Sequence, residues 1–191
     1  SSAESDVYKR QHEIFIDGAL TFFTMQLIEG TTLQERLQKS LRYEDFQRWT
    51  KQLISALCTC KVADVRHGDI KPNNIIIDTN DDLRLIDFGL GRQQLVGLQC
   101  SGHLDYSAPE VIKLGLATAQ SEIYSLGKVL QEILQAVKFS HAKKSVSLSK
   151  SEINKLKKKL AQLTHPSPNH RPQIDDLESF IFSPQKLNKT Y

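Results

Sequence analysis

The sequence predicts an α+β fold in which helices predominate and a small amount of sheet lies in the first half of the chain. Apolar residues recur at steps of three or four in several segments, which is typical of amphipathic helices. Short apolar or alternating runs separated by polar residues indicate strands. At 191 residues the chain is long enough to build one sizeable core.

The first predicted elements are a pair of strands and a long helix. Residues 13–17 and the apolar run that begins at Phe22 are expected to be the strands, which taken alone describe an ordinary hairpin. A helix is predicted from about Tyr43 to Ala63. Its apolar positions at helical spacing are Phe46, Trp49, Leu53, Leu57 and Cys60.

A second hairpin is predicted in the middle of the chain. The runs Ile75–Ile77 and Leu83–Ile86 flank the polar residues 78–82, which suit a turn. Such a hairpin would hold Asn74 at its entrance and Asp87 at its exit, so we expect these two side chains to converge.

Three more helices complete the predicted elements. Ser149 and Glu152 form a capping box in front of one of them, whose apolar positions begin at Ile153. The apolar residues that mark the other two are Ile123, Leu126, Leu130, Ile133, Leu134 and Val137 for the first, and Leu177, Phe180 and Ile181 for the last.

Two polar motifs stand on either side of the predicted second hairpin. Residues 67–74 read His-Gly-Asp-Ile-Lys-Pro-Asn-Asn, and residues 87–89 read Asp-Phe-Gly. In this order they resemble the catalytic loop and the metal-binding loop of eukaryotic-type protein kinases. An isolated Asp-Phe-Gly is often only a turn, whereas the ordered pair is specific. The resemblance implies a protein-kinase-like fold, with a mostly helical C-lobe and a remnant of the N-lobe sheet.

The resemblance implies roles for four side chains. Asp69 would orient the attacking hydroxyl and take its proton, and Lys71 would place a cation near the transferred phosphate. Asn74 and Asp87 would be the magnesium ligands, since amide and carboxylate oxygens suit this cation. We therefore expect Asp69, Lys71 and Asn74 to be catalytic, Asp87 to contact the bound nucleotide through magnesium, and ATP and Mg2+ to be the cofactors.

Residues 22–33 resemble the last strand of the kinase small lobe as it runs into the hinge. Met25 would stand at the back of the adenine pocket. The backbone of Gln26, Leu27 and Ile28 would then offer hydrogen bonds to adenine.

Later segments follow the family's order. Residues 102–110 resemble the end of an activation segment that closes with Ala-Pro-Glu, and residues 121–127 resemble the start of the central buried helix of the large lobe. Residues 165–172 resemble the segment whose Arg pairs with the activation-segment Glu. The resemblance therefore implies an ion pair between Glu110 and Arg171.

The sequence also departs from the family. Residues 1–12 contain no glycine-rich loop, and no strand Lys or helix Glu of the ATP clamp is found. Gly68 replaces the usual Arg, His103 the usual Thr, and Glu122 the usual Asp, whose longer side chain we still expect to reach the catalytic-loop backbone. We expect a single incomplete domain over 1–191, with late N-lobe strands and the hinge at 13–30, the C-lobe at 31–182 and a tail at 183–191.

Two explanations of the absent clamp remain open at this point. The protein is a natural truncation, or a partner chain or an upstream segment supplies the missing strands.

Composition and charge limit the cellular compartment and the kind of partner that we expect. No apolar run approaches the ~20 residues that a membrane span needs, and residues 1–18 lack a signal-peptide core. Cys58, Cys60 and Cys100 show no metal-binding spacing, which favours a reducing, intracellular setting, cytoplasmic or nuclear. The net charge of +3 is too small to imply nucleic acid, and the lysines of residues 143–159 are interpreted as a solvated helix face.

Three functions remain open on the sequence. The first is a protein kinase that transfers the γ-phosphate of ATP to Ser or Thr of a protein substrate. The second is a pseudokinase-like scaffold, which the absent clamp favours, and the third is a kinase acting on a small molecule, which His103 leaves open. The retained Asp69 and Asp87 favour the enzyme that acts on proteins.

Overall fold

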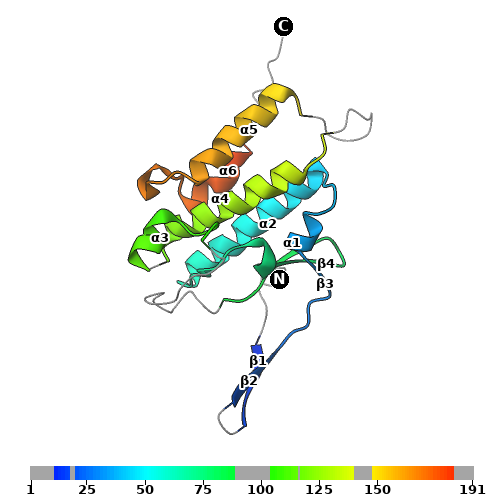
Figure 1. Cartoon of the computed structure of the whole chain (residues 1–191), viewed down its shortest axis with the longest axis vertical. Coiled ribbons are helices and arrows are strands. Elements are labelled where there is room, and N and C mark those ends of the chain that lie inside the picture. Colours follow the sequence, from blue (N-terminus) through cyan, green and yellow to red (C-terminus); the bar gives the residue numbers. More distant parts are fainter. Residues whose placement is uncertain (1–10, 18–19, 89–103, 116, 140–147, 183–191) are drawn as a thin grey trace.

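The computed structural model describes residues 11–17, 20–88, 104–115, 117–139 and 148–182. Helices form most of it, and a small sheet lies against one end of the helical layer (Figure 1). Within these residues no helix is long and apolar enough to cross a membrane.

The N-terminal strands form a hairpin of their own. Strand β1 (Gln11–Asp17) pairs antiparallel with β2 (Leu20–Met25) in a two-stranded sheet, as the apolar runs predict. The hairpin projects away from the helical layer, and residues 26–29 connect it to β3 (Gly30–Thr32) (Figure 1).

A three-stranded antiparallel sheet supports the central motifs. Its order is β3, β4 (Ile75–Asp78) and β5 (Leu83–Leu85), and Ile75 pairs with Leu85. The predicted second hairpin is therefore confirmed. Because side chains alternate along a strand, Ile75, Ile77, Leu83 and Leu85 all point into the core and are buried.

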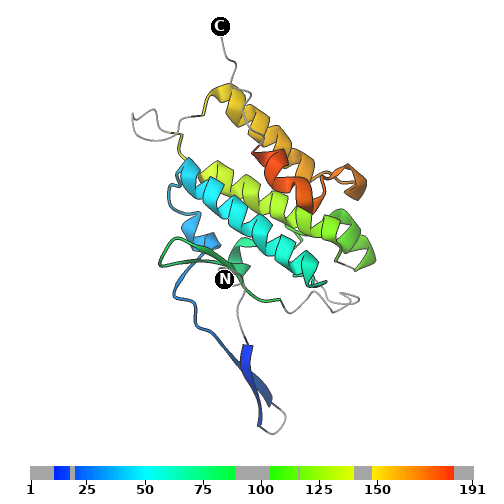
Figure 2. The same ribbon diagram turned by 180° about the vertical axis from the view of Figure 1, so that it is seen from behind.

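The helices predicted from the spacing of apolar residues are confirmed. Helix α4 lies between α2 and α5, and its apolar face is buried from both sides (Figures 1 and 2). The helices that the structure describes are α1 (Leu33–Arg36), α2 (Tyr43–Val62), α3 (Pro109–Leu114), α4 (Ala119–Ala136), α5 (Lys150–Leu163) and α6 (Leu177–Ile181), with short 3-10 turns at Pro72–Asn74, Pro168–His170 and Ile174–Asp176.

Capping decides where two of these helices begin. At α5 the predicted box is present, because Glu152 N donates to Ser149 Oγ at 3.2 Å and Ser149 N donates to Glu152 Oε2 at 2.7 Å. Helix α4 begins four residues before its first apolar marker, Ile123. There Thr118 Oγ1 accepts from Ser121 N at 3.1 Å. Since Ser replaces the usual Glu or Gln of the box, the sequence signal for this start is weak.

One glycine sets the spacing between α4 and α5. A Cβ at Gly127 would lie 2.7 Å from Leu163 Cβ and 2.9 Å from Thr164 Cγ2. Real Cβ atoms do not approach this closely, so the contact between the two helices requires glycine.

Candidate active site

Three of the predicted catalytic residues meet in the loop between α2 and β4. Lys71 Nζ lies 2.6 Å from Asp69 Oδ2, and Asn74 Nδ2 donates to the same oxygen at 2.8 Å and to the Asp69 carbonyl at 2.9 Å. The Lys71 and Asp69 side chains are only 10% and 18% exposed. The Asp69 carboxylate is therefore held in one orientation by two donors.

His67 connects this loop to the segment after β5. Its ring is fully buried, Nε2 donates to the Ile86 carbonyl at 2.8 Å, and Nδ1 accepts from Asp69 N at 3.2 Å. A neutral imidazole makes both bonds, and burial holds the pKa of His67 below its usual value. His67 is thus a buried structural residue that ties the loop to the segment after β5.

Asp87 lies between two anchored neighbours. Ile86 N donates to the Asn74 carbonyl at 2.9 Å, and the Phe88 ring lies 4.6 Å from the His67 ring, centroid to centroid. Asp87 itself is exposed and has a φ of 63°, a left-handed conformation that is costly for a residue with a side chain. Its carboxylate makes no hydrogen bond or ion pair with the described residues.

Glu122 of α4 binds the backbone of the predicted catalytic loop. Its Oε1 accepts from His67 N at 2.5 Å and from Gly68 N at 3.3 Å, so the longer carboxylate reaches the loop backbone as predicted. Gly68 has a φ of 80°, a conformation that glycine adopts readily. Glycine in place of the usual Arg therefore suits the backbone conformation at position 68. The sequence alone does not reveal this conformation.

The expected hinge runs beside a cavity. Residues 26–29 have no regular structure, and Leu27 is 82% exposed. The side chain of Met25 lies outside the described part of the chain. The cavity has a volume of about 180 Å³ and is lined by Gln26, Leu27, Ile28, Glu29, Asp78, Thr79 and Arg84. None of the predicted catalytic-loop residues lines this cavity.

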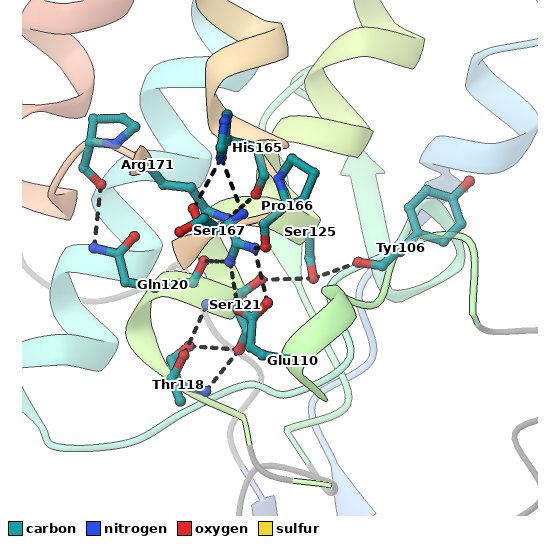
Figure 3. A network of polar contacts seen from close by, with 11 residues as sticks. Tyr106, Glu110, Thr118, Gln120, Ser121, Ser125, His165, Pro166, Ser167 and Arg171 are labelled. Carbon is teal, nitrogen blue, oxygen red and sulfur yellow. Dashed lines mark hydrogen bonds and ion pairs between the residues drawn. The ribbon is translucent and has the colours of Figure 1, made fainter. Parts of the chain in front are cut away.

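The predicted pair of Glu110 and Arg171 is present, with Arg171 buried and Glu110 partly buried (Figure 3). Arg171 Nη1 and Nη2 lie 2.5 and 2.9 Å from Glu110 Oε1 and Oε2. Burial raises the pKa of Glu110, but the hydrogen bond and charge of Arg171 outweigh it, so the net pKa is lowered. The guanidinium also donates to the carbonyls of His165, Gln120 and Pro166. Arg171 thus joins three separate segments of the large lobe.

Comparison with known proteins agrees with this geometry. The family model described as protein kinase domain matches residues 8–188. The chain belongs to the protein kinase family. The resemblance of its motifs is thereby confirmed, and its helical layer with a reduced sheet is a kinase-like fold.

The relatives of this kinase domain are longer proteins. CBL-interacting serine/threonine-protein kinase 20 of Arabidopsis thaliana is 32% identical over 186 residues, which is 87% of this chain and 42% of that protein. CBL-interacting serine/threonine-protein kinase 5 of the same plant is 37% identical over 131 residues, 64% of this chain and 29% of that protein. CBL-interacting protein kinase 5 of Oryza sativa subsp. japonica is 29% identical over 186 residues, 87% of this chain and 40% of that protein. The chain spans about two fifths or less of each.

One contact of this kinase domain has no signal in the sequence. Tyr106 Oη donates to Glu132 Oε1 at 2.7 Å, and Ser125 Oγ donates to the Tyr106 carbonyl at 2.8 Å. Burial, and then the Glu132 hydrogen bond and charge, raise the pKa of Tyr106. Both bonds tie Tyr106 to α4, and Figure 3 shows the one from Ser125. His103, which the sequence singles out, lies outside the described residues.

The oxygen atoms near Asn74 suit a hard cation. Because Nδ2 of Asn74 makes both bonds to Asp69, its Oδ1 faces away, and it accepts no hydrogen bond in the described part of the chain. The Asp87 carboxylate is likewise unengaged there. Among described residues no group of three His, Cys, Asp or Glu side chains could hold a metal. The two residues that the sequence predicts as magnesium ligands would offer one amide and one carboxylate oxygen, and Mg2+ accepts only a few protein ligands.

Proposed function

We propose that this kinase domain transfers the γ-phosphate of ATP to a Ser or Thr hydroxyl of a protein substrate, with Asp69 as the base. The observation that supports it most is the Asp69 carboxylate. Lys71 and Asn74 both bond Oδ2, whereas Oδ1 accepts no hydrogen bond from the described residues. A fixed carboxylate with one free oxygen can orient an attacking hydroxyl and accept its proton.

Asn74 and Asp87 are the proposed magnesium ligands, through Asn74 Oδ1 and the Asp87 carboxylate. When bound, Mg2+ neutralises the charge that grows on the phosphate oxygens. Lys71 adds a buried positive charge two residues from Asp69, close to where the transferred phosphate would lie. The backbone of Gln26, Leu27 and Ile28, with Met25 behind it, is the proposed adenine site.

The proposed organisation is a single domain with the late N-lobe strands and hinge at 13–30, the C-lobe at 31–182 and a tail at 183–191. The β1–β2 sheet has two strands, and an isolated hairpin is only marginally stable. This supports the proposal that residues 13–30 are part of a larger N-lobe sheet. We infer that an upstream segment or a partner chain supplies the remaining strands and the ATP clamp. The lack of metal-binding cysteine spacing favours an intracellular setting.

A scaffold that binds without catalysis is the second candidate. Residues 1–25 of this sequence contain no glycine-rich loop and no strand Lys in the family's context. In that case the retained Asp69 and Asp87 would be remnants. A kinase for small molecules differs from the main proposal in its acceptor alone.

The first experiment is the melting temperature of the chain with and without magnesium-ATP. A nucleotide at 100 times its Kd adds about 2.7 kcal/mol to the free energy of unfolding. We expect a shift in the wild type, little or none in Asp87→Ala, and a wild-type shift in Asp176→Ala, which changes an exposed carboxylate before α6. No shift at millimolar nucleotide would make the scaffold the better proposal.

Transfer itself is tested with radiolabelled ATP, magnesium and a mixture of general protein substrates. We expect label on protein Ser or Thr that disappears in Asp69→Asn. Label on small acceptors alone would support the third candidate. The assay is repeated with a longer chain that includes any upstream segment, which tests whether the ATP clamp comes from there.

A further inference from the structure

The exposed side of α5 carries lysines that are not paired with an acid. Leu156, Leu160 and Leu163 form the buried side of this helix. The exposed lysines, which we call the α5 basic face, are Lys150, Lys155, Lys157 and Lys158. Within the described part of the chain, none of the four forms an ion pair or donates a side-chain hydrogen bond.

Helix α5 has little acid to balance this charge. Residues 149–163 contain five lysines and one acidic residue, Glu152, a net charge of +4 in a chain whose total is +3. Glu152 Oε2 accepts the capping bond from Ser149 N at 2.7 Å. The fifth lysine, Lys159, is directed at α6, where its Nζ donates to the Ile181 carbonyl at 3.4 Å. The four lysines of the basic face therefore meet solvent as uncompensated charge.

The distribution of these lysines does not favour the helix itself. Lys155 and Lys158 are three positions apart, and like charges at this spacing repel each other on a helix. Lys150 is the first residue of α5, where the positive end of the helix dipole disfavours a cation. A surface that only keeps a protein soluble is best served by both signs of charge interspersed. A face of one sign suits a partner of the opposite sign.

The α5 basic face lies away from the candidate active site. Helix α5 packs on α4 and α6 and forms the outer edge of the helical layer, on the side away from the β3–β5 sheet (Figures 1 and 2). The loop that carries Asp69 directly precedes β4 of that sheet. A helix of 14 residues is about 21 Å long. A partner bound along α5 would therefore leave Asp69 accessible.

The composition of the face favours a lipid surface over a protein or a nucleic acid. The other exposed residues of α5 are small or uncharged, namely Ser151, Asn154, Ala161 and Gln162. No large apolar side chain among the exposed residues of this helix could form the desolvated centre of a protein interface. The helix also has no Arg for bidentate phosphate contacts and no aromatic ring to stack on bases. Lysines act as point charges, which is sufficient for a diffuse layer of anionic headgroups.

We propose that the α5 basic face binds the surface of anionic lipid membranes, with its four lysines lying over the headgroups. Each lysine close to such a surface strengthens binding about fivefold. The attraction falls off within a Debye length, about 10 Å at 0.1 M salt. The attachment is therefore reversible and sensitive to salt, and it involves no insertion into the hydrocarbon. It is independent of the proposed phosphoryl transfer.

Co-sedimentation of the chain with lipid vesicles tests the proposal. The two probes are vesicles of phosphatidylcholine alone and vesicles of phosphatidylcholine with about 30% phosphatidylserine. At about 0.1 M salt we expect the chain to sediment with the anionic vesicles and not with the neutral ones. High salt should release it. Equal binding to both vesicles, or no binding to the anionic ones, would overturn the proposal.

A pair of matched variants separates the α5 basic face from net charge. Lys157→Gln combined with Lys158→Gln removes two lysines of the face and should weaken binding to the anionic vesicles about 25-fold. Glutamine and lysine have similar helix propensities, so α5 is retained. The control variant loses the same charge at exposed positions outside α5, through Lys39→Gln and Lys113→Gln. It should bind as the wild type does, and an equal loss in both variants would refute the role of the face.

The other anionic partners are tested with the same variants. Duplex DNA and polyglutamate are added at the same salt concentration in place of vesicles. We expect weaker binding to both than to the anionic vesicles. If either probe binds the wild type more tightly than the vesicles do, and loses this affinity in the Lys157 and Lys158 variant, the partner is a nucleic acid or an acidic protein and the membrane proposal is wrong.

Discussion

Arg171 and Glu110 meet as a forked guanidinium and a carboxylate, with Nη1–Oε1 and Nη2–Oε2 distances of 2.5 and 2.9 Å. They are 61 residues apart in the chain. The arginine side chain is fully buried, and the Tyr124 ring lies 5.0 Å from its guanidinium carbon. Two N–H···O bonds in parallel fix both distance and angle, so this pair sets how α3 sits against the segment before α6.

Arg171→Ala is expected to destabilise the domain strongly. Removing one partner of a buried pair leaves an uncompensated charge and costs about 3–5 kcal/mol, which corresponds to a melting temperature lower by roughly 10 °C for a chain of this size. Differential scanning calorimetry measures the change. Arg42→Ala, whose arginine pairs with Asp45 but is 69% exposed, should change stability far less. Equal decreases in melting temperature in the two variants would contradict the prediction that the Arg171 pair stabilises the domain more than an exposed pair.

Acidification is expected to destabilise the fold through His67. Burial lowers the pKa of this ring, so the unfolded chain binds a proton at a higher pH than the folded chain. The stability from neutral His67 is complete above about pH 6.5 and is lost as pH falls from there toward the folded pKa, at about 1.4 kcal/mol per pH unit. Urea unfolding at several pH values measures it.

The control for this prediction is a second histidine. His67→Gln should flatten the pH dependence of the free energy of unfolding between pH 7 and 5. His170→Gln, at an exposed position, should leave this dependence unchanged. The same slope in wild type and His67→Gln would contradict the prediction.

Thr50→Val is expected to stabilise the domain. Thr50 is fully buried on α2, and its Oγ1 has no hydrogen-bond partner among the described residues. An unsatisfied buried hydroxyl costs about 1–3 kcal/mol, and Val replaces it with a methyl group of similar shape. We expect a gain of about 1 kcal/mol in urea unfolding. Thr59→Val on the same helix removes a bond from Oγ1 to the Ser55 carbonyl at 3.0 Å and should give no gain.

Gly127→Ala is expected to be destabilising although alanine favours helices. The added Cβ would overlap Leu163 Cβ, an atom fixed close to the α5 backbone. Overpacking of this kind costs about 1–3 kcal/mol, more than the gain in helix propensity of about 1 kcal/mol. Thermal unfolding measures the difference, and Gln135→Ala, on an exposed position of α4, is the control. A more stable Gly127→Ala protein would show that α5 can move away at little cost.

Much of the fold could be predicted from local sequence patterns. The spacing of Phe46, Trp49, Leu53 and Leu57 predicts α2, and the Ser149 and Glu152 box predicts the start of α5. These patterns succeed because a helix or strand must bury one face, and its period is written within a few turns of chain. Glu110 and Arg171 were predictable as a pair because each lies in a recognisable motif.

Tertiary structure alone decided how distant side chains meet. Tyr106 and Glu132 have no shared period or motif, since they come from different elements. The left-handed backbone of Asp87 is held by its two neighbours. Ile86 is hydrogen-bonded to Asn74 and His67, and the Phe88 ring packs against the His67 ring. The sequence by itself determined the elements and the chemistry of the loop residues. Packing of α2, α4 and the loop decided which charges face each other, because burial and the distance between groups exist only once the chain has folded.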